Sequence, residues 1–151
     1  MMKKKESIEI FLESRKIAVA GVSANTKKFG YAVFNELRQK GFDICPINPK
    51  LEELDGIKCY ASVNQIPDGY QKLFIVTPKT ETDRIIEDAA RKGIKHIWVQ
   101  QMSNTTETKK IAKDNGVELI DKECIFMFAE PVNSIHKFHR GLWKLFGLLP
   151  K

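Results

Sequence analysis

Short apolar runs alternate with segments of helical periodicity along most of this chain, and that alternation limits the possible folds more than any other feature. The runs are nearly continuous, which is typical of strands covered on both faces of a sheet. The five expected strands cover residues 16–22, 42–49, 70–78, 95–101 and 117–121. Helical segments between them predict a parallel, doubly wound α/β sheet. Because right-handed crossovers leave few arrangements, we expect a Rossmann-like fold of about five strands in the order 3-2-1-4-5, with flanking helices.

Four segments have the spacing of amphipathic helices. The first covers about residues 4–15 and places Ile8, Phe11 and Leu12 on one face. The others cover 29–41, 80–93 and 105–116, and each ends in glycine, a common helix terminator. In the segment 80–93 we expect Thr80 to cap the N-terminus, with Asp83 completing a variant of the capping box.

Length and composition predict a single globular domain, since the chain has 151 residues of which 42% are hydrophobic and 29% charged. We place this domain at residues 1–133 and a C-terminal amphipathic helix at 134–151. No apolar run approaches the ~20 residues of a membrane span, and no signal-peptide pattern follows the basic start. Three cysteines without CxxC spacing fit reduced thiols. We therefore expect a cytoplasmic, bacterial-type protein.

The C-terminal segment carries apolar residues near one helical face and basic residues elsewhere. The apolar residues are Ile135, Phe138, Leu142, Leu145 and Phe146. We expect a helix over about 134–148 that packs on the domain or on a second protomer. In the second case the terminal helices would form a homo-oligomer. An interfacial membrane helix is the alternative, since such helices combine a basic face with Trp and Phe. The net charge of +6 favours an anionic partner, but scattered basic residues do not favour nucleic acid.

Polar loops follow the first four expected strands, at the sheet edge where doubly wound folds bind ligands. They read GVSANTKK, NPK, TPKT and QQMSN, which suits a polyanionic ligand with a sugar and a base. In the first loop, Gly21 and Gly30 permit close backbone approach, and Ser23 offers a hydroxyl. Free N–H groups at the helix start favour phosphate, and Lys27 and Lys28 add positive charge. A purely structural turn is the alternative for this loop.

The second loop distinguishes between nucleotide ligands. Folds of this kind that prefer NAD place Asp or Glu at the end of the second strand, where the carboxylate binds the ribose hydroxyls. This chain has Asn48, Pro49 and Lys50 there instead. A lysine suits a phosphorylated ribose, as in NADP or coenzyme A (CoA). The alternative is a surface lysine that follows a proline turn.

A combination of motifs then points to a family. The chain carries AGVS after the first strand, INPK after the second, the connection GIKCYAS, and WVQ at the end of the fourth strand. Together these resemble the CoA-binding domain family, the stand-alone relative of the N-terminal domain of the succinyl-CoA synthetase alpha subunit. The resemblance covers about residues 14–128. The first loop has more lysine and less proline than many relatives, and the tail after Phe128 falls outside the family pattern.

The resemblance implies a Rossmann-like domain that binds coenzyme A or an acyl-CoA. It implies that the first loop lies near the pyrophosphate, the second near the adenosine and its 3′-phosphate, the third against the adenine or the pantetheine arm, and the fourth near the thiol end of the arm. Carried over by position, these residues are Gly21, Val22, Ser23 and Lys27; Asn48, Pro49 and Lys50; Val76, Thr77 and Pro78; and Gln100 and Gln101.

Catalytic groups are not evident in the sequence. The phosphohistidine of the synthetase relatives lies in a second domain, which 151 residues are too few to include. Ser23 has no nucleophile-elbow motif, and His136 and His139 lack further ligands for a metal. We therefore expect a non-catalytic CoA-binding carrier, sensor or regulatory module. The alternative is an NADP-binding oxidoreductase or a nucleotide-binding regulatory protein, although no segment after the fifth strand offers a substrate site.

Overall fold

The computed structural model describes residues 3–128 of the chain. The expected helix at 134–148, the boundary at 133, His136, His139 and the contacts of the tail lie outside the described residues. The helices are α1 (Lys4–Glu13), α2 (Phe29–Gln39), α3 (Lys79–Lys92) and α4 (Thr108–Asp114), with short 3-10 turns η1 (Val63–Gln65) and η2 (Ile125–Met127). The strands are β1 (Lys16–Ala20), β2 (Asp43–Ile47), β3 (Glu53–Leu54), β4 (Ile57–Lys58), β5 (Lys72–Ile75), β6 (His96–Gln100) and β7 (Glu118–Glu123).

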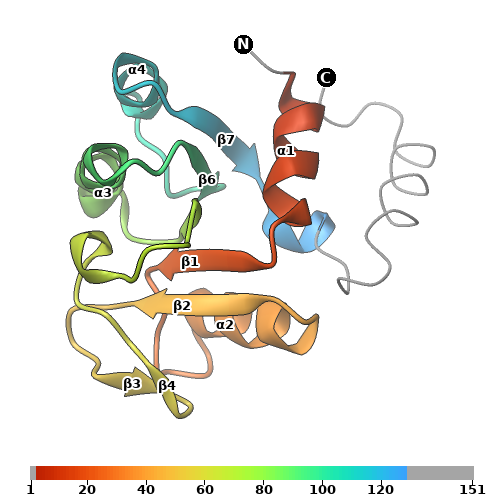
Figure 1. Ribbon diagram of the computed structural model, residues 1–151, viewed down its shortest axis with the longest axis vertical. Coiled ribbons are helices and arrows are strands. Elements are labelled where there is room, and N and C mark those ends of the chain that lie inside the picture. Colours follow the sequence, from red (N-terminus) through yellow and green to blue (C-terminus); the bar gives the residue numbers. More distant parts are fainter. Residues whose placement is uncertain (1–2, 129–151) are drawn as a thin grey trace.

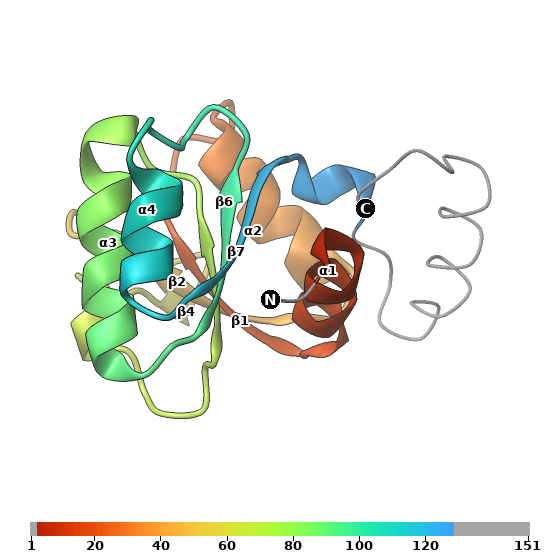
Figure 2. The ribbon, with the colours of Figure 1, turned by 90° about the horizontal axis from the view of Figure 1, so that it is seen from above.

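Five of these strands form one parallel sheet in the order β2-β1-β5-β6-β7, which confirms the predicted fold class (Figure 1). Seen from above, α3 and α4 cover one face of the sheet, and α1 and α2 cover the other (Figure 2). The small hairpin β3–β4 lies outside the main sheet. The carboxyl ends of the parallel strands share one edge, and the loops at that edge supply the candidate site.

The strand order corrects the sequence-based expectation of 3-2-1-4-5. In chain order the five strands stand 2-1-3-4-5, because the third one, β5, pairs with β1 on the side away from β2. The position outside β2 is occupied by the connection after β4, which makes only a single parallel bridge between Ile47 and Tyr60. One bridge is too short to form a strand, so the next full strand lies on the other side of β1.

Alternation along the strands divides the core into two layers. In β1, Ile17 and Val19 pack toward α1 and α2, whereas Ala18 and Ala20 face α3 and α4. Trp98 on β6 is fully buried. Its ring packs edge to face with the ring of Phe11 on α1, and the two ring centroids are 5.4 Å apart. The apolar face predicted for the first helix is therefore confirmed, and the sheet covers it.

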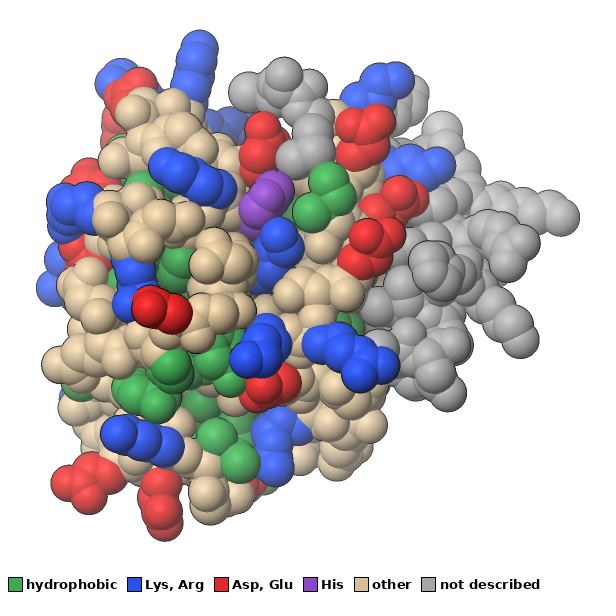
Figure 3. All heavy atoms as spheres, in the orientation of Figure 1, with side chains coloured by type: hydrophobic (Ala, Val, Ile, Leu, Met, Phe, Trp, Pro, Cys, Tyr) green, Lys and Arg blue, Asp and Glu red, His purple; other side chains and the backbone are tan. Residues whose placement is uncertain are grey.

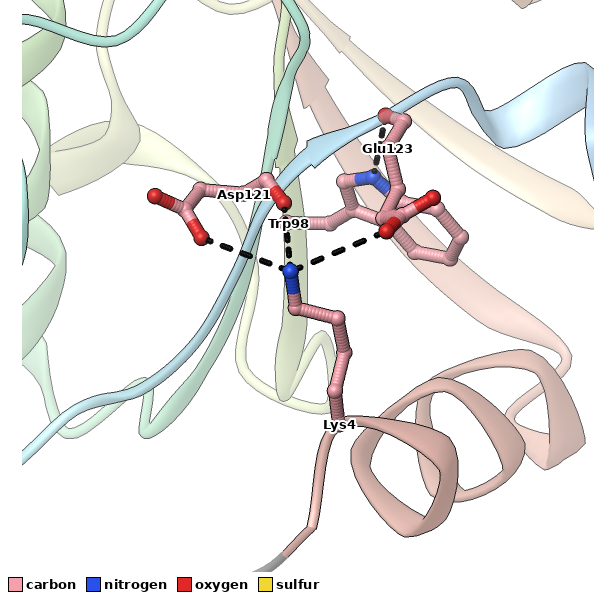
Figure 4. A network of polar contacts seen from close by, with 4 residues as sticks. All are labelled: Lys4, Trp98, Asp121 and Glu123. Atoms are coloured by element: carbon pink, nitrogen blue, oxygen red, sulfur yellow. Dashed lines mark hydrogen bonds and ion pairs between the residues drawn. The ribbon is translucent and has the colours of Figure 1, made fainter. Parts of the chain in front are cut away.

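A polar network also holds α1 on the sheet (Figure 4). The Nζ of Lys4 donates to the backbone oxygen of Asp121 at 3.2 Å and lies 3.7 Å from Oε1 of Glu123. The indole N–H of Trp98 donates to the backbone oxygen of Glu123 at 3.1 Å. The pairing of β6 with β7 is irregular here, because Trp98 lies opposite Ile120 but Gln100 lies opposite Glu123. Lys4 therefore binds a carbonyl at an irregular part of the ladder, a β-bulge.

The predicted cap of the third helix is wrong. α3 begins at Lys79 with Pro78 at its N-cap, and no side chain caps it. Instead, the carboxylate of Asp83 accepts hydrogen bonds from the hydroxyls of Thr105, at 2.6 Å, and Thr108, at 2.7 Å. These two threonines lie at the start of α4, so Asp83 fixes α4 against α3. The carboxylate of Asp83 therefore takes part in a tertiary contact and not in the helix cap that the local sequence predicted.

The distribution of charged side chains over the surface agrees with their scatter along the sequence. On the face that Figure 3 shows, Lys and Arg side chains are interspersed with acidic ones and form no continuous basic stripe among the described residues. Within residues 3–128, no helix is long and apolar enough to cross a membrane.

We predict that Asp83→Ala lowers the free energy of unfolding by about 1–3 kcal/mol, because it removes the carboxylate that accepts hydrogen bonds from the hydroxyls of Thr105 and Thr108. Urea denaturation followed by circular dichroism measures this. Asp114→Ala is the matched control, since Asp114 forms only an exposed ion pair with Lys110, which contributes little to stability. Equal effects of the two changes would contradict the role given to Asp83.

Candidate ligand-binding site

Two glycines bring the ends of three elements into contact. Gly21 has a φ of +101°, and a Cβ built on it would lie 2.7 Å from the backbone carbonyl of Val76, which follows β5. A Cβ on Gly30 would lie 2.1 Å from the backbone oxygen of Gly21. Both distances are too short for any side chain, so the start of α2 packs directly on the end of β1, and the end of β1 packs on the end of β5.

The turn between Gly21 and Gly30 is held by its own side chains. The Oγ of Ser23 accepts a hydrogen bond from the N–H of Asn25, and the Oδ1 of Asn25 accepts one from the N–H of Lys27, both at 3.0 Å. Lys28 is the N-cap of α2. The N–H groups of Phe29 and Gly30 have no acceptor among residues 3–128. The turn therefore presents unpaired donors at the positive end of a helix dipole.

Asn48 joins the loop after β2 to the loop after β1. Its Nδ2 donates to the backbone oxygen of Val22 at 2.8 Å, and its Oδ1 accepts from the N–H of Lys50 at 2.8 Å. The side chain predicted to meet the adenosine thus uses both of its polar atoms within the protein. Pro49 and Lys50 are exposed and remain available to a ligand.

The loop after β5 is anchored to α3 by threonines. The hydroxyls of Thr77 and Thr82 form a buried hydrogen bond of 3.0 Å, and the Thr82 hydroxyl also lies 3.4 Å from the backbone oxygen of Pro78. Thr82 is fully buried. The N–H groups of Lys79 and Thr80 at the start of α3 have no acceptor among the described residues. A second helix N-terminus therefore opens at the same sheet edge.

These loops surround a cavity of about 770 Å³, a size within the range of small-molecule sites. The structure brings together nine of the predicted contact residues in its wall: Gly21, Val22, Ser23, Asn48, Pro49, Lys50, Val76, Thr77 and Pro78. The positive side chains in the wall are Lys28, Lys50 and Arg84. The cavity lies at the carboxyl ends of β1, β2 and β5, where the direction of winding changes.

Three predicted contact residues are not in this wall. Lys27 is exposed outside the cavity, whereas the neighbouring Lys28 lines it. Gln100 is buried, and its Oε1 accepts a hydrogen bond from the N–H of Ile125 at 3.2 Å. Gln101 lines a separate hollow beyond α3. Gln100 lies on the same face of β6 as Trp98, and η2 covers it there.

The sequence analysis missed one wall of the cavity. Ala61, Ser62 and Val63 reach it because the bridge at Tyr60 brings the connection alongside β2. The facing surface of α3 contributes Glu81, Arg84, Ile85 and Asp88, which have the spacing of a single helical face. That spacing is visible in the sequence, but a second face of α3 is equally regular, and only the fold shows which one lies on the cavity.

The cysteines near this region are poorly suited to covalent chemistry. Burial raises the pKa of the Cys45 thiol to about 12, and burial also raises the pKa of the Cys59 thiol. A thiol with a raised pKa is mostly protonated at neutral pH and is a weak nucleophile. Within residues 3–128, no three His, Cys, Asp or Glu side chains gather as a metal site requires.

Comparison with known proteins assigns the chain to a family. Residues 15–130 match the CoA binding domain family, and the chain belongs to it. The resemblance to the succinyl-CoA synthetase type of domain is thereby confirmed. A conserved hypothetical protein from Pyrococcus furiosus has the same fold, with a TM-score of 0.71, 33% identity, and coverage of 74% of this chain and 96% of that one.

Curated relatives include much longer enzymes. The chain is 30% identical over 127 residues to the ADP-forming acetate–CoA ligase of Methanocaldococcus jannaschii, which covers 79% of this chain and 18% of the ligase. It is also 30% identical over 129 residues to the alpha subunit of the ADP-forming acetate–CoA ligase II of Pyrococcus furiosus, covering 78% of this chain and 28% of that subunit. The chain thus spans under a third of either relative. Most relatives are archaeal, so a bacterial type is not shown.

We predict that Gly30→Ala lowers the free energy of unfolding by about 1–3 kcal/mol, because its Cβ would overlap the Gly21 oxygen. Gly56→Ala is the control, since Gly56 has a φ of +81° but nothing within 4 Å of a built Cβ. Backbone strain alone costs about 1–2 kcal/mol at that control position. Crystal structures of both variants would show a displaced α2 only in Gly30→Ala. An unmoved α2 there would refute the close approach.

Proposed function

We propose that this chain binds coenzyme A, free or acylated, in the cavity at the carboxyl ends of β1, β2 and β5. The observation that carries the proposal is the set of phosphate-binding groups in the wall: Lys28, Lys50 and Arg84 outnumber the two carboxylates, and the unpaired N–H groups of Phe29 and Gly30 lie at the start of α2. Such a lining suits a ligand with several phosphates. Membership of the CoA binding domain family supports the same ligand.

The pyrophosphate of CoA binds at the start of α2 in this proposal. The N–H groups of Phe29 and Gly30 donate to its oxygens, and the Lys28 ammonium neutralises part of its charge. Gly21 keeps the approach free of side-chain atoms. Lys28 therefore takes the role that the sequence analysis gave to Lys27, because Lys28 lines the cavity.

The 3′-phosphate of the ligand binds to Lys50. Lys50 stands after β2, at the position where NAD-preferring folds have a carboxylate for the ribose hydroxyls. Asn48 fixes the loop through its two hydrogen bonds, so the Lys50 backbone is held in place before a ligand arrives. NADP also has a phosphorylated ribose, but CoA additionally has an arm that can follow Val76, Thr77 and Pro78 along the sheet edge toward Gln101.

The function we propose for the bound state is that of a non-catalytic carrier, sensor or regulatory module. The cavity wall has hydroxyls at Ser23, Ser62 and Thr77, but no histidine or cysteine among residues 3–128 lines it. Its carboxylates, Glu81 and Asp88, lie on α3. The ligases that resemble this chain extend far beyond the part it matches, and we propose that the shared part is the one that binds CoA.

We expect CoA to bind more tightly than dephospho-CoA, and NAD to show no binding at the same concentrations. One charge-assisted phosphate contact contributes ~1.5–3 kcal/mol, which corresponds to an affinity difference of about tenfold or more. Isothermal titration calorimetry with CoA, dephospho-CoA, NADP and NAD tests this. Equal affinities for CoA and dephospho-CoA would remove the role of Lys50, and tighter binding of NADP would favour the oxidoreductase alternative.

We expect Lys50→Ala and Lys28→Ala each to weaken CoA binding about tenfold while leaving the melting temperature nearly unchanged, since both side chains are exposed. Lys113→Ala is the matched control, because Lys113 is exposed on α4 and lines neither hollow. Lys50→Ala should also abolish the preference for CoA over dephospho-CoA, whereas Lys28→Ala should keep it. Lys27→Ala, measured alongside, decides between the two neighbouring lysines. Unchanged affinity in both Lys50→Ala and Lys28→Ala would reject the cavity as the site.

A further inference from the structure

A second hollow, of about 550 Å³, lies at the same sheet edge, beyond the start of α3 and at the ends of β6 and β7. Its wall includes Lys79 from α3, Lys109 from α4, Lys122 from β7, and Gln101 and Met102 from the loop after β6. Pro78 lines the first cavity and the next residue, Lys79, lines the second hollow. The two hollows are therefore neighbours on either side of the first turn of α3.

Unusual backbone geometry shapes this second hollow. Met102 has a φ of +75° and Lys122 has a φ of +63°, a region that residues with side chains rarely adopt. Met102 occupies the turn closed by the hydrogen bond from the N–H of Ser103 to the oxygen of Gln100. Lys122 belongs to the irregular part of the β6–β7 ladder that Lys4 holds. Strained residues of this kind gather at functional sites, and bulges redirect side chains.

The polar groups of the hollow are incompletely paired. Lys79, Lys109 and Lys122 are exposed and form no ion pair among residues 3–128. Asp121, also in the wall, is 3% exposed, and its Oδ2 has no hydrogen-bond partner. Three lysines face one carboxylate, so an anion is favoured at the mouth.

Apolar contact is available beside the lysines. The Met102 side chain is 78% exposed, the more exposed of the two large hydrophobic side chains at the surface of the described chain. A flexible thioether adapts to methylene groups of different lengths. The hollow therefore combines a basic mouth and an apolar side.

We propose that the second hollow binds the acyl group of an acyl-CoA, and that it selects acyl groups ending in a carboxylate. This inference rests on the proposed function, since the first cavity must hold the nucleotide end. The arm passes Pro78 and Gln101. Methylenes of the acyl group contact Met102, and the terminal carboxylate lies among Lys79, Lys109 and Lys122.

Succinyl-CoA and butyryl-CoA test the selectivity in the unmodified protein, because they match in chain length and differ in the terminal carboxylate. Calorimetry at low salt should show succinyl-CoA binding about three- to tenfold more tightly, the range expected for a few exposed ion pairs. The preference should shrink in 0.5 M salt, since exposed charges are screened within about 4–5 Å there. Equal affinities at low salt, with CoA itself bound, would overturn the inference and leave the proposed function intact.

A double variant tests the place of binding. Lys109→Ala with Lys122→Asn removes two charges, and asparagine suits the left-handed backbone at position 122. We expect the preference for succinyl-CoA to disappear while CoA affinity stays within about twofold. Lys95→Ala with Lys113→Ala removes the same charge from exposed positions outside both hollows and should keep the preference. A preference that survives in the first variant would overturn the assignment to this hollow, and absent binding of every CoA ligand would instead reject the proposed function.

Discussion

The contact between Gly30 and the backbone oxygen of Gly21 is the constraint on which the candidate site depends. It allows the start of α2 to lie directly over the end of β1, and Gly21 in turn lies against Val76 after β5. Backbone atoms thereby meet where side chains would normally separate the elements. The unpaired N–H groups of α2 consequently face the cavity at the centre of the sheet edge. A phosphate can reach them without displacing a side chain, which is the physical use of glycine in such turns.

Many polar side chains at this edge form hydrogen bonds within the protein itself. Asn48 links two loops, Ser23 holds its own turn, and Thr77 anchors the loop after β5 to α3. Each uses its hydrogen bonds to fix backbone, so the loops lose little further entropy when a ligand binds. The groups left for recognition are mainly backbone N–H groups and the exposed lysines. This division is the reason that the proposed recognition depends on the phosphates of the ligand more than on its sugar.

Alternation of apolar runs and helical segments was enough to predict the class of fold, because burial on both faces leaves a continuous apolar signature in each strand. The strand order depended on whether the connection at Tyr60 formed a full strand, and a single bridge leaves no such signature. Asp83 shows the same limit, since its partners on α4 lie over twenty positions away in the chain. Gln100 was expected at the ligand, but η2 returns to cover it, and local sequence carries no sign of that return. The sequence could place the loop residues next to glycine or proline at the sheet edge, because the position of these residues depends only on where the strands end.

The N-terminal helix takes part in this edge through β7. Lys4 binds the backbone oxygen of Asp121 in the same ladder irregularity that gives Lys122 its left-handed conformation. Asp121 is buried, and one of its carboxylate oxygens has no hydrogen-bond partner, which costs free energy of folding. The bulge therefore needs other contacts that stabilise it. Lys4 supplies a charge near that carboxylate, at 4.0 Å from Oδ1, while the indole of Trp98 fixes the next part of the strand through Glu123. Because Phe11 packs on the same Trp98, the apolar burial of α1 and the shape of the second hollow are parts of one arrangement. A helix that the sequence alone presents only as a cover for the sheet thus also contributes to the geometry of β7 at the second hollow.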